Sequence, residues 1–123
     1  MKNLTFVVVD DAIFMRTLLK KMIEEEENYK VVGEGFNGYE AIEQAKANQP
    51  DIMTLDITMP DMDGIKAVKE VLKVSPNTKI IMVSAMGQQS MVIEAIKLGA
   101  KDFVVKPFEK SRVMQAIRNV TSS

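Results

Sequence analysis

The chain has neither cysteine nor histidine among its 123 residues. Without cysteine it has no disulfide bonds and no thiol chemistry, which is typical of a reducing compartment. Without histidine it lacks the most common general base, a frequent metal ligand and any phosphohistidine carrier. Any chemistry must therefore depend on carboxylates, hydroxyls, lysine or a hard metal ion.

The chain also lacks an excess of charge of either sign and a long hydrophobic run. It has 16 basic and 17 acidic residues, a net charge of -1, which gives no electrostatic reason to bind nucleic acid or an anionic membrane. No apolar run approaches the roughly 20 residues of a membrane span, and the N-terminal residues enter a strand pattern rather than a signal peptide. We expect one cytoplasmic domain, residues 1–123, without an output domain and monomeric.

Five short apolar runs alternate with helical patterns along the chain. The runs cover residues 4–9, 30–34, 52–55, 79–83 and 102–105, and the amphipathic patterns cover 12–27, 40–48, 65–72, 88–98 and 109–120. This spacing is typical of βαβ units, and continuously apolar strands indicate a parallel sheet covered on both faces. The sequence predicts a single α/β domain with a doubly wound sheet.

Polar side chains follow four of the five predicted strands. Asp10 and Asp11 follow the first strand, Asp56 the third, Ser84 the fourth and Lys106 the fifth. Right-handed crossovers make the strands parallel, so these residues meet at the carboxyl edge of the sheet, where open α/β sheets bind ligands. The second strand ends without such a residue, which favours an edge position and the strand order 2-1-3-4-5.

The residues expected at this edge have compatible chemistry. Crowded carboxylates repel one another unless a hard divalent cation neutralises them, and oxygen ligands favour Mg²⁺. An ionised Asp56 beside a metal and Lys106 can attack phosphorus and form an acyl phosphate. The metal and Lys106 would offset charge on the phosphoryl group, and the Ser84 hydroxyl could donate a hydrogen bond to it.

Each of these residues also has a simpler interpretation when taken alone. Asp10 and Asp11 could cap the first helix, and Asp56 could be a turn residue before the following proline. Ser84 could lie in an ordinary loop, and Lys106 could be a solvated lysine. The joint pattern on four strands favours the phosphoryl site over four separate coincidences.

These residues resemble the receiver domain of bacterial two-component response regulators. The resemblance covers the whole chain and rests on Asp10-Asp11, Asp56, Met59-Pro60, Asp63-Gly64, Ser84-Ala85 and Lys106-Pro107. It implies a flavodoxin-like fold and phosphorylation of Asp56 by a histidine kinase. It also implies that Mg²⁺ is held by Asp10, Asp11, Asp56 and the backbone carbonyl of Thr58, and that Ser84 and Lys106 contact the phosphoryl group.

Within this family, segments 84–89 and 99–103 look most like the stand-alone regulators of chemotaxis. That likeness implies a signalling protein rather than an enzyme, with the chemotaxis kinase, the flagellar motor switch protein and a phosphatase as partners. A phosphorelay intermediate remains an alternative. The resemblance leaves the phosphoryl lifetime open, because Thr58 and Met86, which flank the phosphoryl group in this pattern, carry neither a carboxylate nor an amide.

The resemblance also suggests how a signal would leave the site. Phe103 occupies a position where tyrosine is common in the family. We hypothesise that phosphorylation draws Ser84 toward the phosphoryl group and that Phe103 turns inward to fill the vacated space. The face that changes would comprise the fourth helix, fifth strand and fifth helix. The fourth helix is apolar on more than one side, so we expect exposed apolar surface there.

Two rival functions share parts of this pattern. Aspartate-nucleophile phosphatases usually have a second acid two residues after the nucleophile, where this chain has Thr58. Flavin-binding electron carriers of the same fold need a phosphate-binding loop after the first strand, and Asp10-Asp11 would repel a phosphate that lacks a metal. Both are less favoured than a receiver.

Two local features complete the predictions. The four glutamates at 24–27 indicate a solvated and frayed helix end, because acidic residues are unfavourable at a helix C-terminus. The Lys106-Pro107 peptide bond is expected to be cis, since cis bonds occur mainly before proline.

Overall fold

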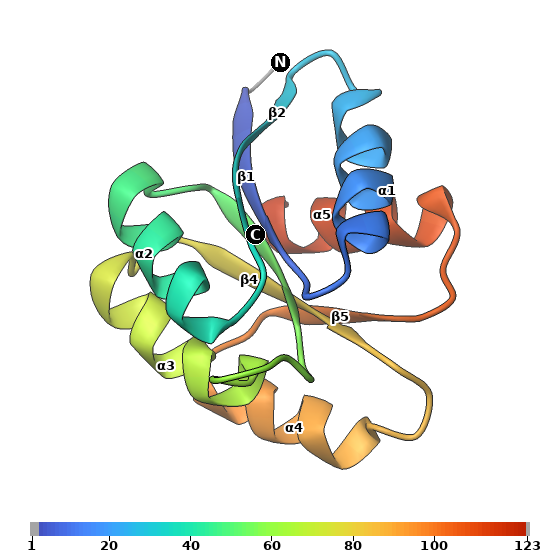
Figure 1. The fold of residues 1–123 in the computed structure, drawn as a ribbon. Helices are drawn as coiled ribbons and strands as arrows, with labels where there is room; N and C mark the ends of the chain where they lie inside the picture. The colour runs from blue at the N-terminus through green and yellow to red at the C-terminus, as the bar shows by residue number, and fades with distance from the viewer. Residues whose placement is uncertain (1–2, 123) are drawn as a thin grey trace.

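Five strands alternate with five helices over residues 3–122, the part of the chain that the computed structural model describes (Figure 1). In chain order the elements are β1 (Leu4–Val9), α1 (Ile13–Glu24), β2 (Tyr29–Gly35), α2 (Gly38–Asn48), β3 (Ile52–Asp56), α3 (Gly64–Val74), β4 (Lys79–Ser84), α4 (Gln89–Leu98), β5 (Asp102–Val105) and α5 (Lys110–Thr121).

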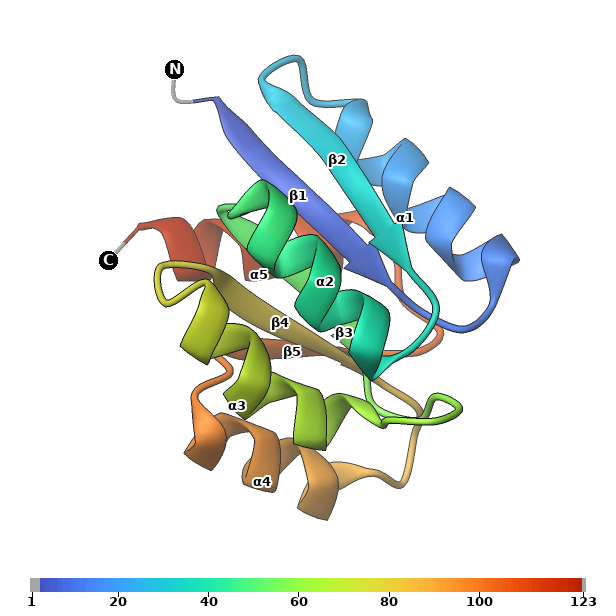
Figure 2. The ribbon, with the colours of Figure 1, turned by 60° about the vertical axis from the view of Figure 1, so that its left-hand side comes forward.

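The strands form one parallel sheet in the order β2-β1-β3-β4-β5, as predicted. Helices α1 and α5 cover one face, and α2, α3 and α4 cover the other (Figures 1 and 2). The chain builds the sheet outward in two directions from β1, so β1 and β3 lie side by side at the topological switch point. The flavodoxin-like fold class is confirmed.

Both faces of the sheet are buried, which explains the continuously apolar strands. Val7 and Val9 of β1 pack toward α2, α3 and α4, whereas Phe6 and Val8 pack toward α1 and α5. All five residues of β3 are buried. The central strands are therefore fixed on both sides, and the residues at their carboxyl ends have well-defined positions.

Helix α1 ends at Glu24, three residues earlier than predicted. The Glu24 carboxylate accepts a hydrogen bond of 3.1 Å from the backbone N–H of Val31 on β2. The Lys110 ammonium on α5 lies 3.0 Å from Glu25 and 3.6 Å from Glu26. All four glutamates are exposed, as predicted, but three of them make contacts that only the tertiary fold brings together.

The other element ends agree with the sequence within two residues. Asn37 and Asp63 cap α2 and α3, accepting hydrogen bonds of 2.9 and 3.0 Å from backbone N–H groups in the first turn. Gly99 ends α4 with a φ of 125°, as predicted. The Lys106-Pro107 bond is cis. No helix within residues 3–122 combines the length and apolar character that a membrane span requires.

Candidate functional site

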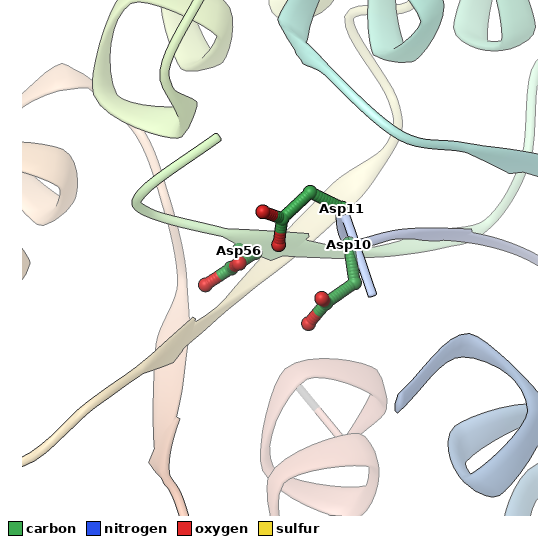
Figure 3. Close-up of side chains that lie close together, drawn as sticks. All are labelled: Asp10, Asp11 and Asp56. Atoms are coloured by element: carbon green, nitrogen blue, oxygen red, sulfur yellow. The ribbon is translucent and has the colours of Figure 1, made fainter. Parts of the chain in front are cut away.

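The carboxyl ends of β1 and β3 bring Asp10, Asp11 and Asp56 together (Figure 3). Each contributes a carboxylate oxygen, and these oxygens all lie within 4.8 Å of one another. Asp10 and Asp56 are only 1% and 6% exposed, whereas Asp11 is exposed. The three acids predicted from sequence therefore form one cluster, open to solvent on the side of Asp11.

Lys106 supplies the positive charge of the site. Its Nζ lies 2.9 Å from Asp10 Oδ2 and 3.5 Å from Asp56 Oδ1. Its backbone N–H donates a 2.7 Å hydrogen bond to the carbonyl of Ser84, which ties the end of β5 to the end of β4. Lys106 is thus in the site as predicted, but its closest partner is Asp10 rather than Asp56.

The environment shifts the proton affinity of two of these groups. Burial, together with the neighbouring Asp10 carboxylate, raises the pKa of Asp56 to about 6, although Lys106 opposes the shift. Burial disfavours the charged form of Lys106, but its hydrogen bond to Asp10 and the charge of Asp56 outweigh that effect and raise its pKa. Lys106 is therefore a fixed cation, and Asp56 is ionised only at a free-energy cost.

The acidic pair does not cap the first helix. The N-cap of α1 is Ala12, and Asp10 Oδ1 accepts a 2.9 Å hydrogen bond from the Ala12 N–H without joining the helix. The capping interpretation of Asp10 and Asp11 is therefore wrong. The loop hydrogen bond aims one oxygen of Asp10 at the backbone and leaves the other for Lys106.

Arg16 is a neighbour of the site that the sequence did not single out. Its guanidinium donates a 2.7 Å hydrogen bond to the backbone carbonyl of Asp10 and forms a 3.2 Å ion pair with Glu34 on β2. It therefore fixes the end of β1 against α1 and β2. One feature of the sequence could have pointed to Arg16: it is a basic residue one turn into the helix that follows the acidic pair.

Gly64 explains why the loop after β3 is so tight. A Cβ at this position would collide with the backbone carbonyl of Asp56, and the Gly64 N–H donates a 2.7 Å hydrogen bond to the Ile57 carbonyl. The preceding Asp63 caps α3. Together these contacts hold the loop close behind Asp56.

Ser84 lies at the end of β4 and is 1% exposed. Within residues 3–122 its hydroxyl makes no hydrogen bond, so it is free to bond to a ligand.

Thr58 is exposed, two residues after Asp56. A carboxamide from Gln88 contacts Thr58: Gln88 Nε2 donates a 2.9 Å hydrogen bond to Thr58 Oγ1. Sequence reasoning did not anticipate this contact.

Phe103 points outward from β5 and is 37% exposed. The Arg112 guanidinium on α5 lies 5.9 Å from the centre of its ring and donates a 2.6 Å hydrogen bond to its backbone carbonyl. A cavity of about 520 Å³ separates Phe103 from the β4–α4 loop. Its walls include Ser84, Met86, Val92, Ile93 and Val105.

The acidic cluster fits a hard divalent cation. It offers carboxylate oxygens from three residues, with no nitrogen or sulfur ligand among them, and it is open to water at Asp11. A cation of this kind would also relieve the repulsion between the buried carboxylates, which Lys106 and backbone N–H groups offset only in part.

Comparison with known proteins agrees with this geometry. Residues 6–118 match the response regulator receiver domain family. The chain is 59% identical to the chemotaxis protein CheY of Thermotoga maritima over 94% of its own length and 95% of the relative, and 53% identical to CheY of Bacillus subtilis over 90% and 92%. A CheX–CheY–BeF₃–Mg²⁺ complex from Borrelia burgdorferi has a similar structure, with a TM-score of 0.89, 33% identity and coverage of 97% and 90%.

The matched region contains all the strand ends of the acidic site, and the sheet order is the one expected for the fold. The chain belongs to the response regulator receiver domain family and is closely related to the CheY regulators of chemotaxis.

Proposed function

We propose that this receiver accepts a phosphoryl group on Asp56 from a histidine kinase, with Mg²⁺, and that the modification changes the surface formed by α4, β5 and α5. The observation that carries the proposal is the cluster of Asp10, Asp11 and Asp56 with Lys106 between two of its members. This arrangement provides a carboxylate that can act as a nucleophile and a positive charge that can stabilise a phosphoryl group.

Phosphoryl transfer requires an ionised Asp56. A pKa of about 6 leaves this carboxyl mostly ionised near neutral pH, so its oxygen can attack phosphorus. The new P–O bond forms as the P–N bond of the donor phosphohistidine breaks, and the histidine nitrogen leaves with the bonding electrons. Lys106 lies 3.5 Å from Asp56 Oδ1 and can stabilise the added negative charge.

Asp10, Asp11, Asp56 and the backbone carbonyl of Thr58 are the proposed Mg²⁺ ligands. When bound, the ion supplies positive charge that neutralises the carboxylates and the phosphoryl oxygens. Asp10 is also held by the Ala12 N–H and by Lys106, so its position is set before a ligand arrives. Arg16 supports this arrangement by fixing the backbone of Asp10.

The proposed switch uses Ser84 and Phe103. The free hydroxyl of Ser84 would bond to a phosphoryl oxygen, which moves the β4–α4 loop toward Asp56. Phe103 would then rotate into the cavity of about 520 Å³ beside that loop. Because Arg112 now contacts the ring in its outward position, the rotation exchanges that contact for burial of the ring.

The surface that would change already exposes apolar side chains. Exposed fractions on α4 are 42% for Met91, 56% for Ile93 and 41% for Ile96. Apolar surface of this kind marks many protein interaction sites. On the basis of the CheY relatives, we propose the chemotaxis kinase as donor, the flagellar motor switch as output and a phosphatase as a further partner, for a cytoplasmic, monomeric signalling protein.

The decisive experiment is intact mass spectrometry after incubation with acetyl phosphate, with and without Mg²⁺. Wild type should gain one phosphoryl group only when Mg²⁺ is present, and Asp56→Asn should gain none. Asp51→Asn, at the opposite end of β3, is the matched control and should be phosphorylated. Modification of Asp56→Asn, or none of wild type with Mg²⁺, would contradict the proposed function.

The switch can be tested separately with beryllofluoride, which mimics an aspartyl phosphate. Addition of beryllofluoride and Mg²⁺ to ¹⁵N-labelled wild type should shift the backbone signals of both the site and α4. In Phe103→Ala the site signals should still shift, whereas those of α4 should shift much less. Equal α4 shifts in both proteins would exclude Phe103 as the coupling residue.

A further inference from the structure

Gln88 joins two loops at the site. Its Oε1 accepts a 2.7 Å hydrogen bond from the backbone N–H of Ala85, and its Nε2 donates a 2.9 Å hydrogen bond to Thr58 Oγ1. Ala85 lies in the loop after β4, and Thr58 lies in the loop after β3. Within residues 3–122 this is the single side-chain hydrogen bond between the two loops. One carboxamide therefore connects the segment that follows Ser84 to the segment that follows Asp56.

Little else fixes the β4–α4 loop. Ala85, Met86 and Gly87 are all exposed, and Met86 is 77% exposed. A Cβ added to Gly87 would have no neighbour within 4 Å in the part of the chain that the structure describes. Where packing contributes so little, two hydrogen bonds have a large share in deciding where the loop lies.

The loop begins next to Ser84, the residue that moves in the proposed switch. Ser84 immediately precedes Ala85, and its hydroxyl has no hydrogen-bond partner within residues 3–122. The cavity beside Phe103 lies against the same loop. In the proposed switch, a movement of Ser84 toward a phosphoryl group on Asp56 would carry Ala85 with it, and the link that Gln88 makes to Thr58 would resist that displacement.

We propose that Gln88 is a positioning residue that holds the β4–α4 loop to the β3–α3 loop and opposes closure of Ser84 onto the phosphoryl group. The proposal rests on the proposed function and deepens it, because it assigns control of the switch to a side chain outside the acidic cluster. Thr58 and Met86, the two residues expected to flank the phosphoryl group, have no carboxamide of their own. The side chain of Gln88 brings one to Thr58.

The size of the effect follows from the number of bonds involved. A neutral hydrogen bond changes an equilibrium constant by a factor of about two to ten in proteins. Loss of the link should therefore favour the closed loop, and strengthen binding of a phosphoryl mimic, by about three- to ten-fold.

The test measures the affinity of each protein for beryllofluoride at fixed Mg²⁺ by titration of ¹⁵N NMR signals. Gln88→Met keeps the length of the side chain and removes both hydrogen bonds, and Thr58→Val removes one. Both variants should bind beryllofluoride more tightly than wild type, and Thr58→Ser, which keeps the hydroxyl, should show less of the increase than Thr58→Val. Gln115→Met is the matched control, because the exposed Gln115 side chain on α5 makes no hydrogen bond within residues 3–122 and does not line the cavity beside Phe103, and it should bind like wild type.

Two readouts separate a specific link from a general loss of structure. The double variant Gln88→Met/Thr58→Val should bind no more tightly than Gln88→Met alone, since both remove the same bond. The Ala85 amide signal of free Gln88→Met should shift upfield as its N–H loses the carboxamide acceptor. Additive effects, unchanged affinity or weaker affinity in Gln88→Met would overturn the proposal. Failure of wild type to bind beryllofluoride with Mg²⁺ would instead overturn the proposed function.

Discussion

Two aspartates at opposite ends of β3 have opposite surroundings. Asp51, just before the strand, accepts hydrogen bonds of 2.8 and 3.2 Å from the backbone N–H and hydroxyl of Thr5. Asp56, five residues later, is buried beside the carboxylate of Asp10, with the exposed Asp11 carboxylate and the Lys106 ammonium close by. The first end of the strand is a satisfied polar network that stabilises the fold. The second contains excess negative charge that a cation or a reaction would relieve, as expected of a functional site.

Among the substitutions that test this contrast, removal of the Lys106 charge should change the free energy of unfolding most. In Lys106→Met the buried Asp10 loses its cationic partner, because the Lys106 ammonium lies 2.9 Å from an acid that is 1% exposed. Loss of one partner of a buried ion pair costs about 3–5 kcal/mol. The free energy of unfolding of Lys106→Met, measured by urea denaturation at pH 7.5 without Mg²⁺, should fall by about that amount.

Lys110→Met is the matched control for Lys106→Met. Lys110 also pairs with two carboxylates, at 3.0 and 3.6 Å, but these side chains are about half exposed. Solvent screens exposed pairs, so the free energy of unfolding should show no measurable change. Equal losses in the two variants would mean that the acidic cluster is no more sensitive to charge than the surface.

The same substitution at the two ends of β3 should have effects of opposite sign. Asp56→Asn removes a charge that burial and Asp10 disfavour, and a pKa raised from 3.8 to about 6 corresponds to a gain of about 2–3 kcal/mol in the free energy of unfolding at pH 7.5. Asp51→Asn weakens the hydrogen bonds from Thr5 and should lose about 1 kcal/mol. Urea denaturation without Mg²⁺ measures both. A loss of stability in Asp56→Asn would contradict the idea that its charge is unfavourable.

The stabilisation by Asp56→Asn should also depend on pH. Folded Asp56 keeps its proton up to about pH 6, whereas the unfolded side chain loses it near 3.8, so the native state binds more protons between these values. Stability contributed by this group therefore falls as pH rises through that window. The advantage of Asp56→Asn over wild type should shrink from about 2–3 kcal/mol at pH 7.5 to about 1 kcal/mol at pH 4.5. A constant difference across this range would show that Asp56 does not titrate there.

The sequence predicted the edge of the sheet better than the contacts around it. Strand order and the meeting of Asp10, Asp56 and Lys106 follow from parallel strands and right-handed crossovers, because strand ends are fixed by topology. The contacts of Gln88 and Arg112 were not predictable. Each joins segments brought together only by tertiary packing, and nothing in a glutamine or arginine at the start of a helix indicates its partner.

The smallest expected effect concerns polar groups inside the sheet. It tests whether unpaired polar groups occur within β3 as well as at its carboxyl end. Thr54, on β3 two residues before Asp56, is 2% exposed, and its hydroxyl is buried without a hydrogen-bond partner among residues 3–122. Thr78 is 3% exposed, but its hydroxyl donates a 2.7 Å hydrogen bond to the Pro50 carbonyl at the amino-terminal edge.

Valine has nearly the same shape as threonine and lacks the hydroxyl. Thr54→Val should therefore leave the free energy of unfolding unchanged or raise it by up to about 1 kcal/mol, because it removes an unpaired buried polar group. Thr78→Val should lower it by about 1–3 kcal/mol, because the Pro50 carbonyl loses its donor. Urea denaturation of both variants gives the comparison directly. A clear loss in Thr54→Val would mean that its hydroxyl has a partner, such as a buried water, and that the interior of β3 is as well satisfied as its amino-terminal end.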